Sequence, residues 1–422
     1  MKKEGELIKM SRKNIRVAEM FAGVGGFHLG LTRANSDFEI VWANQYEPSK
    51  KNQFAYKIYK NNFPKTKILN DDISLVDKNT IPDIDLLVGG FPCQDYSVAS
   101  TGAKGIYGKK GVLWWDIIEV LQCKKPDYIF LENVDRLLTS PGVNTQQPGR
   151  DFGMILRTLY DLGYGVSWKM INAADYGFPQ RRRRTFIFAF KNETNFKTTV
   201  ETIVENGTEE IREFLRTMAP LSSSLGVDYV DKVIEVDLRK YTDLVDFSDN
   251  FYINKGFKKT GFMVDGKVFM ADYHPQIAKA TPLNSIVASN ETDATLYLTE
   301  DKIQKFKELK SGFRTIKTSK TGHNYPYGMG AIAFPDPLDK PARTMVTTER
   351  TVSRMSHVIK DPGNGRLRLL SPEEAEKINT FPVGWTDCEG VSISNRYFTM
   401  GNALVVDLVK EIAVEIYKII RT

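Results

Sequence analysis

Four short apolar runs in the first 90 residues constrain the fold most strongly, because each of them ends in glycine or polar residues. The runs cover residues 15–21, 38–43, 67–70 and 84–88. Apolar runs of this length, bounded by turn residues, predict buried strands. Strands that alternate with helices form a parallel sheet, so their carboxyl ends lie along one edge. We therefore predict an α/β fold with a functional site along that edge.

The composition is that of a globular protein with a full core. The chain has 422 residues, of which 41% are hydrophobic and 26% charged, enough for two domains. It contains no apolar run long enough for a membrane span and no signal-peptide core, so we expect a cytoplasmic protein. Its three cysteines lack paired spacing, which predicts neither disulfides nor a metal site. The net charge of +6 permits a polyanionic partner.

A glycine-rich turn, residues 22–26, follows the first predicted strand and opens a helix. Glycines let the backbone approach a ligand, and a helix N-terminus offers free N–H groups, although such turns also occur for steric reasons alone. Glu47, after the second strand, is placed to accept ribose hydroxyls. Asp72, after the third strand, can accept a hydrogen bond from an exocyclic amine such as that of adenine. Together these residues predict a nucleoside ligand.

A single cysteine, Cys93, comes directly after the fourth predicted strand. A lone cysteine is more often a small buried hydrophobe than a reactive group. Cys93, however, lies between Pro92 and Gln94, outside any apolar stripe, which makes it a candidate nucleophile. Residues 94–111 contain four glycines and three lysines. They predict a basic loop that covers the site and suits phosphates.

Two later strands supply further candidates. The fifth strand, 126–131, leads into Glu132, whose carboxyl group neighbours Cys93 if the fourth and fifth strands pair. Four arginines, 181–184, begin another strand. Such a run is usually a solvated or phosphate-facing patch, but alternate residues of a strand share a face. We therefore expect Arg182 and Arg184 to point the same way.

The ordered motifs resemble those of the C5-cytosine DNA methyltransferase family. They are Phe-Ala-Gly-Val-Gly-Gly (21–26), Gly-Gly-Phe-Pro-Cys-Gln (89–94), Glu-Asn-Val (132–134), Gln-Arg-Arg-Arg-Arg (180–184) and Gly-Asn (401–402). Pro-Cys-Gln and Glu-Asn-Val at strand ends, in this order, are the most specific. Ala403-Leu404 departs from the Ser-Val that is frequent in the family, and Ala99 stands where serine is usual.

The resemblance implies a Rossmann-like methyltransferase sheet with a second, smaller, irregular β-rich target-recognition domain. From about residue 191 to 340 the strand–helix alternation fades. This segment corresponds to the region that the resemblance implies to be the variable target-recognition region. We predict a catalytic and cofactor-binding domain at 1–193, completed by 386–422. The target-recognition domain and hinge are predicted at 194–385.

The implied activity is methylation of cytosine C5 within a specific double-stranded DNA sequence, with S-adenosyl-L-methionine as donor, base flipping and a covalent bond from Cys93 to C6. The resemblance also implies a monomeric bacterial or phage-encoded modification enzyme with a companion restriction endonuclease. The implied cofactor residues are Phe21, Gly23, Gly25, Gly26, Glu47, Asp72, Ile73, Pro92, Leu113, Asn402 and Leu404. The implied catalytic residues are Cys93, Glu132, Arg182 and Arg184, and the expected DNA contacts are Gln94, Ser97, Lys104, Lys109 and Lys110.

Three other functions remain open from the sequence. A tRNA cytosine-5 methyltransferase would share the motifs, but the large segment 191–340 favours duplex DNA. A methylase-like DNA-binding regulator would not need the intact set of Cys93, Glu132 and arginines. A dinucleotide oxidoreductase would need a Gly-x-Gly-x-x-Gly pattern, whereas the turn here is Gly-Val-Gly-Gly-Phe-His.

Overall fold

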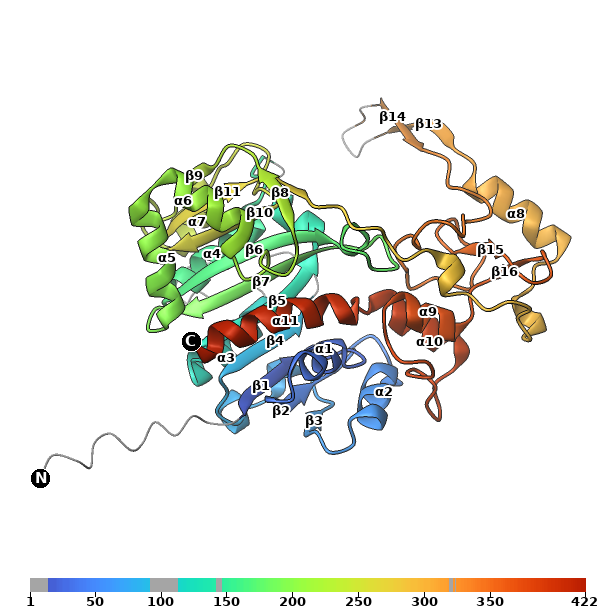
Figure 1. The fold of residues 1–422 in the computed structure, drawn as a ribbon, viewed down its shortest axis with the longest axis horizontal. Helices are drawn as coiled ribbons and strands as arrows, with labels where there is room; N and C mark the ends of the chain where they lie inside the picture. Colours follow the sequence, from blue (N-terminus) through green and yellow to red (C-terminus); the bar gives the residue numbers. More distant parts are fainter. Residues whose placement is uncertain (1–13, 92–112, 142–145, 319–321, 323) are drawn as a thin grey trace, which may run out of the picture.

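A ten-stranded mixed sheet forms the centre of the molecule (Figure 1). The computed structural model describes residues 14–91, 113–141, 146–318, 322 and 324–422. The first five strands in sheet order are parallel: β3 (Ile68–Leu69), β2 (Phe38–Asn44), β1 (Ile15–Met20), β4 (Leu86–Gly90) and β5 (Tyr128–Val134). The predicted α/β sheet, with its strand ends along one edge, is therefore confirmed.

The other half of the sheet is antiparallel. Its strands are, in order, β7 (Arg183–Lys191), β6 (Tyr164–Asn172), β10 (Thr260–Val264), β11 (Lys267–Ala271) and β9 (Ile234–Asp237). The last three come from beyond residue 193, so hydrogen bonding of the sheet continues past the end that we predicted for the first domain. The division into 1–193 and 194–385 itself stays a prediction.

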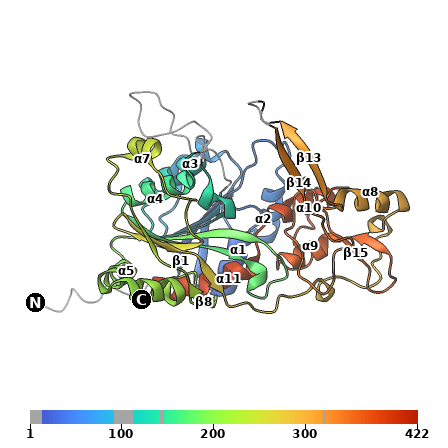
Figure 2. The ribbon, with the colours of Figure 1, turned by 90° about the horizontal axis from the view of Figure 1, so that it is seen from above.

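Helices cover both faces of the sheet (Figures 1 and 2). α1 (Gly26–Ala34) and α11 (Val406–Arg421) pack together on one face, where a Cβ on Gly30 would lie 2.7 Å from Val409. The absence of that Cβ allows the close approach of the two helices. α3 (Leu113–Lys124) and α4 (Arg150–Asp161) contribute to a separate buried cluster, with α7 (Leu244–Asn250) against α4. Among the described residues, the other α-helices before residue 300 are α2 (Phe54–Asn62), α5 (Asn195–Asn206) and α6 (Thr208–Glu213).

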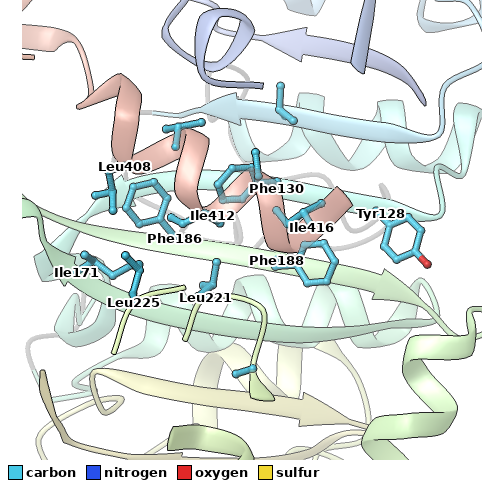
Figure 3. Close-up of a cluster of buried hydrophobic side chains, with 14 of the residues drawn as sticks. Tyr128, Phe130, Ile171, Phe186, Phe188, Leu221, Leu225, Leu408, Ile412 and Ile416 are labelled. Atoms are coloured by element: carbon cyan, nitrogen blue, oxygen red, sulfur yellow. The ribbon is translucent and has the colours of Figure 1, made fainter. Parts of the chain in front are cut away.

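The carboxy-terminal helix α11 completes the core on the face that it shares with α1. Figure 3 shows its apolar side chains Leu408, Ile412 and Ile416, four residues apart, beside Phe130 of β5 and Phe186 of β7. This spacing gives a helix one apolar stripe, as we expected for the end of the chain. The central strands β5 and β7 are therefore buried in part by the carboxy-terminal helix.

A smaller part of the molecule lies beside the main sheet (Figures 1 and 2). It contains α8 (Glu300–Lys310), α9 (Pro372–Ile378), α10 (Ile393–Asn402), the hairpin β13 (Phe313–Thr318) with β14 (Asn324–Met329), and the pair β15 (Val358–Lys360) with β16 (Leu367–Leu369). A further pair, β8 (Val227–Val230) with β12 (Tyr273–Pro275), lies beside the main sheet. Ser371 and Glu374 form a capping box at the start of α9, because each side chain accepts the other's backbone N–H. No helix in the described ranges has the length and apolar character of a membrane span.

Candidate active site

A pocket of about 570 Å³ opens at the carboxyl edge of the parallel strands. Pockets of this size accommodate small-molecule ligands. The predicted site residues that line it are Phe21, Gly23, Glu47, Asp72, Ile73, Leu113, Glu132, Arg182, Arg184 and Asn402. An adjoining smaller pocket shares several of these residues and adds Gly26 and Leu404. The structure thus brings together predicted cofactor and catalytic residues from distant parts of the sequence.

Several predicted residues lie outside the described part of the chain. They are Pro92, Cys93, Gln94, Ser97, Lys104, Lys109 and Lys110. β4 ends at Gly90, and Phe91 is the last described residue before them. Gly90 pairs with Glu132 in the sheet, so the chain enters this segment next to the Glu132 carboxylate.

The glycine turn after β1 adopts left-handed backbone conformations. Phe21, Gly23 and Gly25 have φ values of 55°, 56° and 86°. A Cβ on Gly23 would meet no protein atom within 4 Å, because this glycine borders the open pocket. The Gly23 N–H donates to the Gln45 side chain at 2.7 Å, which fixes the turn against the end of β2. Gln45 was not predicted, because a glutamine after a strand carries no distinctive signal in one sequence.

A buried carboxyl group, Glu19, lies beneath the turn. Burial raises its pKa to about 8, and Tyr59 donates a hydrogen bond to it at 3.0 Å. It also accepts the backbone N–H of His28 at 3.4 Å, in the first turn of α1. The expectation that the N–H groups at this helix end are free for a ligand is therefore wrong for His28. Glu19 therefore satisfies one backbone N–H of the helix terminus from inside the protein.

Local hydrogen bonds hold the two acidic residues that are predicted to contact a nucleoside. The backbone of Glu47 exchanges two hydrogen bonds with the Gln53 side chain, at 2.8 and 2.9 Å. Burial raises the pKa of Glu47, and the nearby Lys50 ammonium opposes that shift. Asp72 accepts the Ser74 N–H at 3.0 Å and the Ser74 hydroxyl at 2.8 Å. These contacts fix the backbone of Glu47 and the side chain of Asp72 at the edge of the pocket.

Glu132 and Arg184 form an ion pair inside the pocket. The distance from Arg184 Nε to Glu132 Oε1 is 2.6 Å, and the two side chains are 18% and 14% exposed, Arg184 being the more exposed. A Cβ on Gly90 would lie only 3.2 Å from Glu132 Oε2, so glycine leaves room for the carboxylate. Asn133 donates to the carbonyl of Phe91 at 2.8 Å and thereby holds the chain just before Cys93. The Glu-Asn-Val motif contained this asparagine, but its role follows only from the structure.

Arg182 lines the same pocket but is 2% exposed and tied to the backbone. Its guanidinium donates to the carbonyls of Met345 and Gly401 at 3.3 and 3.2 Å. Burial, together with the neighbouring Arg184 charge, lowers its pKa. Gln180 adds two links, since it accepts the Met345 N–H at 3.0 Å and donates to the Asn379 side chain at 2.7 Å. Arg182 therefore joins the start of β7 to two segments of the smaller part.

The fold is an α/β sheet with a pocket at the carboxyl edge of its parallel strands, and comparison with known sequences identifies the family. Residues 15–418 match the family C-5 cytosine-specific DNA methylase. The chain belongs to this family and is a DNA (cytosine-5-)-methyltransferase, as the motifs predicted.

Individual relatives agree with this assignment. The chain is 44% identical over 416 residues, 96% of each chain, to type II methyltransferase M.Sau3AI of Staphylococcus aureus. It is 34% identical over 183 residues to type II methyltransferase M.HhaI of Haemophilus parahaemolyticus. This alignment covers 43% of this chain and 51% of the relative. Among solved structures, DNMT2 of S. pombe has a TM-score of 0.58 at 15% identity, covering 97% of this chain and 99% of that one. A mutant of DNMT2 of Spodoptera frugiperda has a TM-score of 0.57 at 16% identity, covering 97% and 100%. These two structures support the fold.

Proposed function

We propose that this enzyme methylates C5 of cytosine within one specific sequence of double-stranded DNA and uses S-adenosyl-L-methionine as methyl donor. The observation that carries the proposal is the single pocket that contains both the Glu132–Arg184 ion pair and the predicted cofactor residues. When bound, S-adenosyl-L-methionine supplies an electrophilic methyl group.

The residues of the pocket fit the donor. Glu47 and Asp72 both line the pocket. We assign to Glu47 the hydrogen bonds from the ribose hydroxyls, and to Asp72 the hydrogen bond from the amino group of adenine. The open space beside Gly23 admits a ligand against the backbone. The other pocket residues assigned to the donor are Phe21, Gly26, Ile73, Leu113, Asn402 and Leu404. Of the remaining predicted residues, Gly25 lines neither pocket and packs against Phe63, and Pro92 lies outside the described ranges.

Cys93 is assigned the role of nucleophile. Cytosine C5 is too weakly nucleophilic to accept a methyl group unaided. The Cys93 thiolate forms a bond to C6, and the electrons of the C5–C6 double bond move to C5, which becomes enamine-like. After C5 has gained the methyl group, a base such as water removes the C5 proton. The C5–C6 double bond then re-forms, and the C6–sulfur bond breaks to release the thiolate.

Glu132 is assigned proton donation to N3 of the cytosine during the attack. A proton at N3 draws electron density out of the ring and so favours addition at C6. The same proton returns to Glu132 when the thiolate leaves, so that neutral 5-methylcytosine is released. Arg184 orients the Glu132 carboxyl group through the 2.6 Å contact and is also placed to hold O2 of the base. Arg182 adds a second positive charge at the same pocket, and its hydrogen bonds to two backbone carbonyls hold its guanidinium in place.

The target base must leave the duplex for this chemistry, because C6 is inaccessible within a base pair. Flipping the base out costs a few kcal/mol, on the order of one stacking and pairing step. The DNA contacts proposed for this step are Gln94, Ser97, Lys104, Lys109 and Lys110 in the segment after Cys93. The type II names of the relatives support a role in restriction–modification, with a companion endonuclease that cuts the same sequence. We further propose that the enzyme acts as a monomer.

Bisulfite sequencing of DNA from cells that express the chain tests this function. We expect one short sequence to carry 5-methylcytosine, whereas cells that express Glu132→Gln carry little. Transfer of a tritiated methyl group to purified duplex DNA and to tRNA is measured in parallel. Transfer to tRNA alone, or unmodified DNA in expressing cells, would contradict the proposal.

A further inference from the structure

The hairpin β13–β14 buries almost none of its surface in the rest of the chain. Every described residue of its two strands is exposed except Tyr327, which is half-buried. The side chain of Ile316 is 72% exposed. An isolated two-stranded hairpin is at best marginally stable in water. A long, exposed ribbon that contributes to no core therefore indicates an element shaped for a partner.

The base of the hairpin is held firmly while its strands project (Figures 1 and 2). The Arg354 guanidinium donates to the carbonyl of Ser311, before β13, at 2.7 Å, and to the carbonyl of Gly330, after β14. Lys310, which directly precedes Ser311, forms a buried ion pair with Asp336 at 3.0 Å. Both strands are thus anchored at the same end, and the ribbon is presented in a fixed direction.

The charge of this segment is of one sign. Residues 309–335 contain no aspartate or glutamate, but include Lys310, Arg314, Lys317 and Lys320. Neither Arg314 nor Lys317 forms an ion pair with any residue that the structure describes. Unneutralised positive charge on a projecting ribbon is complementary to a phosphate backbone.

The two faces of the ribbon differ. On one face Lys317 Nζ lies 3.7 Å from the ring centroid of Tyr327, and the ring centroids of Phe313 and Tyr327 are 6.1 Å apart, so these side chains pack on one another. The opposite face presents Arg314 and Ile316, across from Gly328 and Pro326 of β14. Neither partner residue covers them with a long side chain, which leaves both free for a ligand.

We propose that β13–β14 enters the major groove of the target DNA and that Arg314 and Ile316 read base edges there. A two-stranded β-ribbon fits the major groove. The guanidinium of arginine offers two parallel N–H donors for paired acceptors on a base, and an aliphatic side chain contacts the methyl group of a pyrimidine. Lys317, on the other face, contacts phosphate. This inference rests on the proposed function, because it requires a duplex DNA substrate.

The rate of DNA methylation by the variants Arg314→Ala and Ile316→Ala tests the inference. The wild-type target is first mapped by bisulfite sequencing, and kcat/KM is then measured on that duplex and on duplexes with single base-pair changes. Each variant should lower kcat/KM on the target on the order of 10- to 100-fold. Each should also lose discrimination at one base pair while its affinity for S-adenosyl-L-methionine is unchanged. Arg212→Ala on α6, which removes a half-buried arginine away from the ribbon, is the control and should match the wild type.

The outcomes separate this inference from the proposed function. If the wild type transfers no methyl group to duplex DNA, the proposed function fails. If the wild type is active and both variants keep its kcat/KM and its target sequence, the ribbon inference alone is overturned. Sedimentation tests a protein partner: a wild-type dimer that Ile316→Ala dissociates would make the ribbon a contact between copies of this chain and would also overturn the inference.

Discussion

Arg184 Nε lies 2.6 Å from a carboxylate oxygen of Glu132, although the two residues come from strands that run in opposite directions. β5 and β7 are neighbours in the sheet, and Arg184 is opposite Val134, two residues beyond Glu132. The pair therefore lies diagonally across two strands at the edge where β4 leads toward Cys93. This arrangement places a carboxyl group and a cation beside Gly90, at the end of β4.

Glu132→Gln should lower the rate of methyl transfer by about 10²- to 10⁴-fold, because general acid catalysis contributes about that much. The amide keeps the shape of the side chain and its contact with Arg184 but cannot donate a proton as an acid does. Single-turnover transfer of a tritiated methyl group measures the rate, and equilibrium titrations measure binding. Unchanged affinities for DNA and donor are expected. A loss of less than about tenfold in rate would place N3 protonation on another residue.

Gly23→Ala should weaken binding of S-adenosyl-L-methionine with little change in folding. The added Cβ would meet no protein atom within 4 Å, so it would occupy space that we assign to the donor. The left-handed φ of 56° adds a modest strain, on the order of 1 kcal/mol. Gly384→Ala is the matched control, because Gly384 has a φ of 80° and also has open space around it, in an exposed turn. Calorimetric titration should show weaker binding for the first variant only; equal affinities would contradict the assignment of the turn.

Arg354→Ala should loosen the base of the hairpin β13–β14 without altering the pocket. In the wild type, the Arg354 guanidinium holds the ends of both strands through the carbonyls of Ser311 and Gly330, and the variant removes both hydrogen bonds. Hydrogen exchange of the hairpin amides should accelerate, and kcat/KM on target DNA should fall with donor affinity unchanged. Slow exchange like that of the wild type would show that Arg354 does not hold the ribbon.

Lys169→Met should change how stability depends on pH. Burial lowers the pKa of Lys169 to about 7 from its usual 10.5, and its ammonium group lies 2.7 Å from the Ser222 hydroxyl and over the ring of Tyr273. Between these two pKa values the unfolded chain binds a proton that the folded chain does not. The free energy of unfolding therefore falls as the pH decreases from 10.5 to about 7, by at most about 1.4 kcal/mol per pH unit.

Urea unfolding of both proteins from about pH 7 to about pH 10 measures this effect, because that range lies between the folded and unfolded pKa values. The free energy of unfolding of the wild type should rise with pH more steeply than that of Lys169→Met, and the variant should be the more stable at the lower end of the range. Parallel curves would mean that Lys169 is charged in the folded protein throughout this range.

Much of the parallel half of the sheet was predictable, because its strands are short apolar runs that end in glycine or acidic residues. Those ends must share an edge, so Glu132 was expected beside the end of the fourth strand, and Gly90 is indeed its partner in the sheet. The pattern failed beyond residue 191, since β10, β11 and β9 join the sheet by antiparallel pairing that leaves no strand–helix alternation in the sequence. The buried roles of Glu19 and Lys169 were also missed, because a charged residue within a strand does not reveal its burial.

The arginine run illustrates the same limit at the site. Period-two alternation correctly placed Arg182 and Arg184 on one pocket. It could not show that Arg182 is held by the carbonyls of Met345 and Gly401, which are far away in the sequence. Alternation determines which face a side chain occupies, but long-range packing determines its partners.

The most direct test of the central claim is covalent capture on DNA that carries 5-fluorocytosine at the target position. Fluorine replaces the C5 proton that must leave, so a Cys93–C6 bond that has formed cannot be released after methyl transfer. In the presence of S-adenosyl-L-methionine, the wild type and the control Cys123→Ser, which alters an exposed cysteine, should give a denaturant-resistant protein–DNA complex. Cys93→Ser should give none and should show no turnover on ordinary DNA. A covalent complex or retained methylation by Cys93→Ser would contradict the account.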